Sequence, residues 1–89
     1  MSGEREHFVV FGFDSTHDAL RAETVLLAAG VEVALIPTPR ALGTLCGFAV
    51  RVPVALRAEA VESFSAAGVA PSGAIETEDR VARSRPSER

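Results

Sequence analysis

The amino-acid sequence predicts an α+β domain of the ferredoxin-like type, in which strands and helices follow one another in the order βαββαβ. Two observations favour this fold class. Two amphipathic, helix-like stretches each end at a Gly-Val pair, at Gly30 and at Gly68, and strand-like apolar runs precede and follow each stretch. The commonest compact arrangement of this order is a four-stranded antiparallel sheet, with strand order 4-1-3-2 and both helices on one face.

The composition fits one small globular domain. The chain has 89 residues, 47% of them hydrophobic, and a net charge of −3. We expect a single domain over residues 7–78, preceded by an N-terminal extension over 1–6. From residue 79 onward the chain is charged and nearly free of large apolar side chains, so residues 79–89 are expected to form a disordered, Arg-rich tail.

The composition also excludes several classes of partner. The acidic balance argues against nucleic acid, whose binding needs a clustered basic surface. No apolar run is long enough to cross a bilayer, and the first residues do not resemble a signal peptide. One cysteine cannot form an internal disulfide, which agrees with a reducing compartment. We therefore expect a cytoplasmic protein that binds neither nucleic acid nor membrane.

The first strand and helix have clear boundaries. Residues 7–13 lack polar alternation, which is typical of a central strand with both faces covered. Ser15, followed three residues later by Asp18, resembles a capping box. A helix is therefore expected over residues 15–29, with Gly30 as its stop. Its apolar stripe comprises Ala19/Leu20, Ala22, Leu26/Leu27 and Ala29.

The next two strands are shorter. Residues 31–35 alternate between apolar and polar positions and predict an edge strand with Glu32 pointing outward. Residues 48–52 predict a third strand, in which Arg51 is the single polar interruption. Pro53 ends this strand.

The last helix and strand complete the domain. Residues 54–67 predict a helix with Gly68 as its stop, and residues 73–78 predict a short fourth strand. Four positions of the helix are expected to face the core: Val54, Ala58, Val61 and Phe64.

The loop over residues 36–47 is longer than an ordinary hairpin connection, which suggests a functional site. It contains two of the five prolines and the only cysteine, Cys46. Thr38 and Pro39 fit the N-cap and the first position of one short helical turn, with Gly43 as its stop. We expect the thiol to be accessible at the entrance of the next strand.

The expected topology brings this loop to the first helix. The third strand runs antiparallel beside the first and begins where the first ends, so Cys46 should lie near residues 14–17. A helix N-terminus or a nearby cation favours the nucleophilic thiolate. We expect Arg40 and His17 to support Cys46 as cations, and Ser15 and Thr16 to support it as hydroxyl donors. Gly47 is expected to let another molecule or backbone approach closely.

Each of these residues also has an ordinary structural interpretation. Ser15 can act only as the helix cap, Arg40 as a solvated loop charge and His17 as an exposed residue of the first turn. A lone cysteine is often a small buried apolar residue. The functional interpretation therefore depends on these residues converging on one place.

Other chemistries fit the sequence less well. A Cys-His hydrolase needs a third orienting group and an oxyanion hole. A metal chaperone needs a Cys-x-x-Cys motif, whereas this chain offers one cysteine and two scattered histidines. Lys, Asn, Gln, Trp and Tyr are absent, which excludes a Schiff-base amine, a side-chain amide or a phenol. We expect no metal and no cofactor.

The sequence resembles a small bacterial family described as putative selenium/sulfur carrier protein-like, over about residues 8–78. The blocks that carry the resemblance are F-G-F-D-S-T-H-D-A (11–19), A-L-R-A-E (19–23), A-G-V (29–31), I-P-T-P-R (36–40) and C-G (46–47). The resemblance implies a thiol that accepts sulfur or selenium, as a persulfide or selenosulfide, and passes it on. By this resemblance Cys46 is the attachment point.

Two functions therefore remain open from the sequence. In the first, the protein is a sulfurtransferase-like carrier whose partners are a cysteine desulfurase, or another sulfur or selenium donor, and an acceptor protein. In the second, it is a non-catalytic binding or regulatory module with a structural cysteine. Because helices can cover only one face of an apolar central strand, a homodimer or partner docking is expected under either function.

Overall fold

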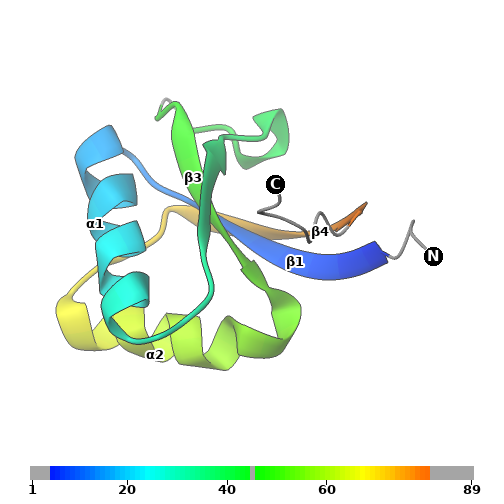
Figure 1. Ribbon diagram of the computed structural model, residues 1–89. Coiled ribbons are helices and arrows are strands. Elements are labelled where there is room, and N and C mark those ends of the chain that lie inside the picture. Colours follow the sequence, from blue (N-terminus) through cyan, green and yellow to red (C-terminus); the bar gives the residue numbers. More distant parts are fainter. Residues whose placement is uncertain (1–4, 45, 81–89) are drawn as a thin grey trace, which may run out of the picture.

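The computed structural model describes residues 5–44 and 46–80, and its elements follow the order βαββαβ (Figure 1). The sheet has the order β2-β3-β1-β4, and each pair of neighbouring strands is antiparallel. Read from the other edge this is 4-1-3-2, so the predicted ferredoxin-like fold is confirmed. The elements are β1 (Arg5–Gly12), α1 (Thr16–Ala28), β2 (Ala34–Pro37), the 3-10 turn η1 (Arg40–Leu42), β3 (Phe48–Pro53), the 3-10 turn η2 (Val54–Leu56), α2 (Arg57–Ala67) and β4 (Gly73–Arg80).

The core lies between the sheet and the two helices. Val9 and Phe11 of β1 are buried in one cluster with Leu26 of α1 and Phe64 of α2. The ring of Phe64 meets the ring of Phe11 edge to face, with centroids 5.1 Å apart, and meets Phe13 in the same way at 5.9 Å. One aromatic side chain of α2 thus joins the strand to the segment that leads into α1.

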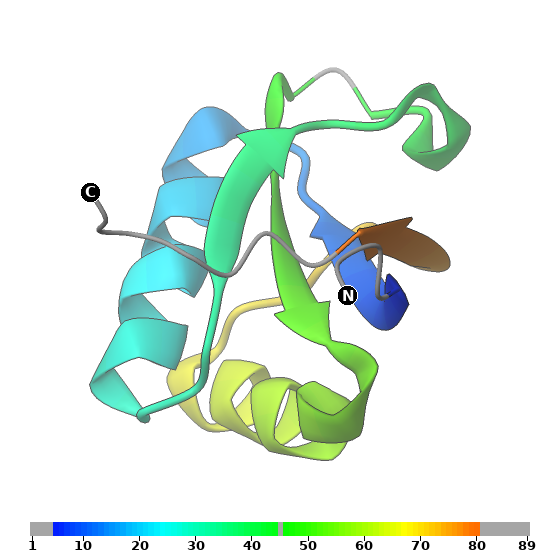
Figure 2. The ribbon, with the colours of Figure 1, turned by 45° about the vertical axis from the view of Figure 1, so that its right-hand side comes forward.

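The opposite face of β1 is also covered, as expected for a central strand. Phe8 and Val10 point away from the helices, and both are buried. The guanidinium carbon of Arg51 lies 4.2 Å from the centroid of the Phe8 ring, a cation–π contact. In Figure 2, η1 lies beyond the strands, on the far side from α1. Loop residues and an arginine, rather than a third helix, therefore cover this face.

The ends of α1 follow the predicted capping pattern, but the next strand begins later than expected. The Asp18 amide donates a hydrogen bond to Ser15 Oγ over 3.1 Å, so the predicted N-cap is confirmed. At the other end Gly30 has a φ of 76°, and the Val31 amide donates to the Leu26 carbonyl. Because this helix-ending motif buries Val31, β2 begins at Ala34 rather than residue 31.

The predicted buried stripe of α2 is largely wrong. Phe64 is buried as expected, but Val54 is 36% exposed, Val61 is 48% exposed, and Ala58 is also exposed. The side facing the core instead carries Ala60 and Phe64. The ring of Phe64 and the small side chain of Ala60 occupy the space above the sheet, and Val54 and Val61 lie on the outer side.

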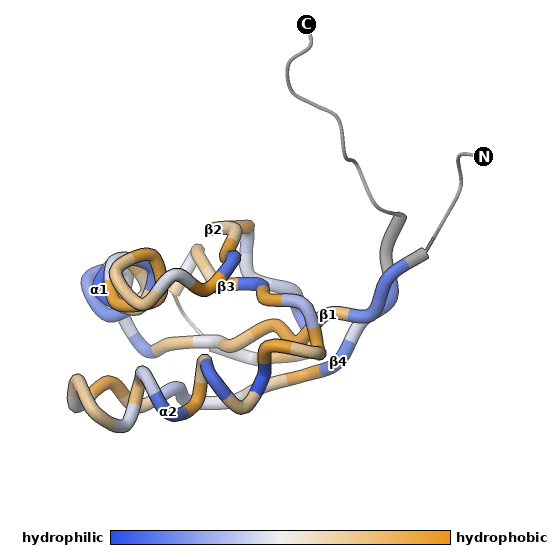
Figure 3. The backbone as a smooth tube through the Cα atoms, turned by 60° about the horizontal axis from the view of Figure 1, so that its bottom comes forward, coloured by the Kyte–Doolittle hydropathy of each residue, from blue (hydrophilic) through white to orange (hydrophobic). Residues whose placement is uncertain are grey.

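The fourth strand is longer than predicted. β4 pairs with β1 along its full length, from Gly12 opposite Gly73 to Arg5 opposite Arg80. Figure 3 shows both strands becoming hydrophilic toward their outer ends. Residues 5–6 and 79–80, expected in the extension and the tail, therefore belong to the sheet. The rest of the extension, residues 1–4, and the rest of the tail, residues 81–89, lie outside the described residues.

Candidate functional site

Cys46 lies beside the first turn of α1, as the topology predicts. Its Sγ is 3.8 Å from Oγ1 of Thr16, the first residue of the helix, within hydrogen-bonding distance for sulfur. The Phe48 amide donates to Sγ over 3.4 Å, and the thiol can donate to the Phe48 carbonyl over 3.2 Å. The sulfur therefore has polar neighbours from two segments that are far apart in the sequence.

The expectation that Cys46 is accessible is wrong in this structure. The residue is only 6% exposed and belongs to the hydrophobic core cluster. A backbone hydrogen bond of 3.1 Å from the Thr38 amide to the Gly47 carbonyl joins the two sides of the loop. The Thr44 hydroxyl also donates to the Cys46 carbonyl over 3.3 Å. These bonds hold the cysteine on the inner side of the loop.

The short turn in the loop begins one residue later than predicted. Pro39, not Thr38, is the N-cap of η1, and its carbonyl accepts a hydrogen bond from the Leu42 amide. The Thr38 amide pairs instead with the Gly47 carbonyl, and within the described residues its buried Oγ1 has no hydrogen-bond partner. Gly43 ends the turn in the left-handed region, at a φ of 66°, so the predicted stop is confirmed.

Leu42 anchors the loop to the sheet. A Cβ added at Gly12 of β1 would lie 3.1 Å from Leu42 Cδ1, and one added at Gly73 of β4 would lie 3.5 Å from Leu42 Cδ2. These two glycines face each other across the β1–β4 pair and leave room for the leucine. The sequence reasoning missed this contact, although a glycine inside a strand often marks a close approach.

The other expected supporting residues do not converge on the sulfur. Within residues 5–44 and 46–80, neither Arg40 nor His17 makes a hydrogen bond or ion pair to Cys46, and both are exposed. Ser15 serves as the helix cap. A Cβ added at Gly47 would meet nothing within 4 Å, so the space at this backbone position is open.

Ser15 can be tested separately from the thiol. We expect Ser15→Ala to lower the free energy of unfolding by about 1 kcal/mol, because it removes the acceptor for the Asp18 amide. Ser15→Asp keeps an acceptor and should retain most of the stability. Urea denaturation of the three proteins measures the difference. Equal stability of the alanine variant and the native protein would contradict the capping role.

Comparison with known families places this geometry in context. A family model described as Putative Se/S carrier protein-like matches residues 8–76, from β1 to β4. The chain belongs to this family. The matched range includes Cys46 and the Thr16 that contacts it. Comparisons with curated proteins and with solved structures find no match.

Two further observations bear on the Se/S carrier-like domain. In the part of the chain that the structure describes, no three His, Cys, Asp or Glu side chains gather in a way that could hold a metal ion. The helices of that same part are also too short or too polar to cross a membrane.

Proposed function

We propose that the protein carries a transferable sulfur or selenium atom on Cys46. Membership of the Se/S carrier-like family supports this function. The observation in the structure that supports it most directly is the placement of Sγ beside Thr16, at the N-terminal end of α1. A carrier needs one thiol with nearby groups that tolerate negative charge on sulfur, and this position offers them.

The neighbours of Sγ suit an anionic sulfur. Once the thiol proton is lost, the Thr16 hydroxyl can donate to the sulfur, and the Phe48 amide already does so at 3.4 Å. The helix macrodipole adds a partial positive charge at the same end of α1. These groups lie where they can donate hydrogen bonds to an anionic sulfur, either on Cys46 itself or on a bound persulfide.

The transfer is a thiol–disulfide type exchange. The Cys46 thiolate attacks the outer sulfur of a donor persulfide, R–S–SH, and a new S–S bond forms as the donor S–S bond breaks. The donor leaves as R–S⁻ with the bonding electron pair, and Cys46 holds –S–SH. An acceptor thiolate then removes the outer sulfur in the same way. A donor carrying R–S–SeH would load selenium without any external oxidant.

The burial of Cys46 means that the loop must open during transfer. The bonds that keep it closed within the described residues are few: the Thr38–Gly47 backbone bond, the Thr44–Cys46 bond and the packing of Leu42. Local opening of such a loop costs less than global unfolding. We infer that the donor and acceptor proteins act on this opened form.

The same burial favours a second candidate function. A cysteine that is 6% exposed within a hydrophobic cluster can act as a small apolar residue of the core. In that case the protein is a binding or regulatory module and its thiol has no chemical role.

Intact-mass analysis separates the two candidates. After incubation with a cysteine desulfurase and cysteine, the native protein is expected to gain about 32 Da for each sulfur atom bound. Dithiothreitol should reverse the gain. Cys46→Ser should remain unmodified while keeping its circular dichroism spectrum, because a serine hydroxyl can use the Phe48 carbonyl as its acceptor. An unmodified native protein, with an active desulfurase in the same mixture, would favour the binding module.

A further inference from the structure

The outer side of α2 carries an apolar stripe that the domain does not bury. Val54, Ala58, Val61 and Ser65 follow one another at intervals of four, three and four residues. This spacing places Ala58, Val61 and Ser65 on one side of α2, in the pattern of a coiled-coil seam, and Val54 precedes them in the turn η2. All four are exposed.

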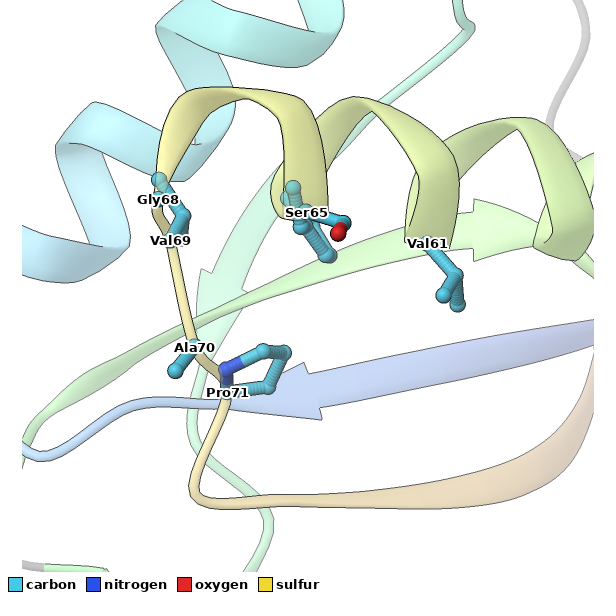
Figure 4. A pocket seen from close by; sticks show the side chains of 7 residues that line it. Val61, Ser65, Gly68, Val69, Ala70 and Pro71 are labelled. Atoms are coloured by element: carbon cyan, nitrogen blue, oxygen red, sulfur yellow. The ribbon is translucent and has the colours of Figure 1, made fainter.

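Two hollows lie along this stripe. One, of about 730 Å³, is lined by Val54, Ala58, Val61 and Ser65 together with flanking residues of η2 and α2. The other, of about 420 Å³, shares Val61 and Ser65 with the first and extends to Pro71. Figure 4 shows Val61 and Ser65 on the side of α2 that faces the segment containing Ala70 and Pro71. Together the hollows form a shallow groove along the helix.

Opposite charges flank the stripe. Arg57 lies on its sheet side, where the guanidinium bonds to the Glu76 carboxylate of β4 over 2.8 Å. At 100° per residue, Glu62 lies on the other side of the stripe and is exposed. The two charges are five residues apart, with Ala58 and Val61 between them.

We propose that this face of α2 binds α2 of a second copy of the chain, with the two helices parallel about a two-fold axis. In such a parallel pair, a residue on one flank of the first helix faces a residue on the opposite flank of the partner helix. The partner residue lies five positions later in the sequence. Arg57 then faces Glu62 of the partner subunit, and the symmetry makes this pair twice. An antiparallel pair would bring like charges together, Arg57 to Arg57 and Glu62 to Glu62.

The side chains of the seam fit this arrangement. Ala58 and Ser65 are small, so the helix backbones can approach closely, while Val54 and Val61 supply the apolar area to be buried. Arg57 uses Nη1 for Glu76 and has further N–H groups for the partner's Glu62. The seam is short, so the dimer is weak and depends on concentration. This proposal does not depend on whether Cys46 carries sulfur.

Sedimentation equilibrium of the full chain, up to about millimolar concentration, tests the proposal. The native protein is expected to approach a dimer, and Val61→Asp to remain a monomer. Arg57→Glu and Glu62→Arg should each weaken association roughly tenfold, because each replaces two attractive pairs by two repulsive ones. The double variant R57E/E62R should recover part of the loss, since it restores both pairs between the chains with their signs exchanged but replaces the Arg57–Glu76 bridge within each chain by a repulsion.

A matched control is available on the other helix. Leu27 of α1 is 60% exposed, so Leu27→Asp introduces the same charge without touching the seam, and should leave association unchanged. A native protein that stays monomeric throughout the series overturns the proposal. Weakening by Leu27→Asp as strong as that by Val61→Asp also overturns it. Failure of the double variant to recover association would exclude the parallel orientation.

Discussion

Replacing Phe64 by alanine is expected to lower the free energy of unfolding by about 3 to 5 kcal/mol, which is much of the stability of a small domain. The side chain is almost fully buried and packs edge to face against Phe11 and Phe13. Alanine would lose the transfer energy of the ring and both aromatic contacts, and would leave a cavity between α2 and the sheet.

Urea denaturation followed by far-ultraviolet circular dichroism measures this loss. Val61→Ala provides the control, because Val61 lies one turn away on the same helix and is 48% exposed. Its cost should stay well below 1 kcal/mol at concentrations where the protein is monomeric. Similar losses for the two variants would mean that α2 does not present Phe64 to the core as described.

Replacing Leu42 by alanine is expected to make Cys46 react roughly tenfold faster with iodoacetamide under native conditions. Leu42 rests over Gly12 and Gly73, and this contact holds η1 against the sheet. Removing the side chain lowers the free energy needed to open the loop. If the buried thiol reacts only from the locally opened form, its alkylation rate rises as this free energy falls. Alkylation can be followed by intact mass in time-resolved samples.

Leu27→Ala removes a leucine of the same size from an exposed position on α1 and should leave the alkylation rate unchanged. Measuring the stability of both variants by denaturation separates opening of the loop from global unfolding. If Leu42→Ala accelerates alkylation only in proportion to its global loss of stability, Cys46 is exposed by unfolding of the whole domain. The loop then provides no separate route to the thiol.

The order of elements and the strand arrangement could be predicted because local patterns report them directly. Ser15 and Asp18 mark the start of α1, and the glycines Gly30 and Gly68 mark the ends of the two helices, whereas α2 begins at Arg57 rather than residue 54 because residues 54–56 form the turn η2. Adjacency of Cys46 to the start of α1 also followed from the sequence, since it needs only the antiparallel pairing of β1 with β3.

The errors arose where tertiary packing decides between similar local patterns. α2 offers apolar residues on two sides, and the ring of Phe64 determined which side faces the core. β2 begins late because the turn after α1 buries Val31. Leu42 meets two glycines from different strands, Gly12 and Gly73, and Cys46 is buried in a core cluster built from several elements. No short window of sequence contains such a contact.

The pairing of β1 with β4 determines how the domain would respond to tension between its two ends. Arg5 begins one strand, Arg80 ends the other, and the two residues are opposite each other in the ladder. A pulling force would therefore enter at one end of the pair and break its hydrogen bonds in sequence, toward Gly12 and Gly73, rather than all at once. The pair would unzip from the end remote from Cys46, and the load would come last to Gly12 and Gly73, where Leu42 of the loop rests.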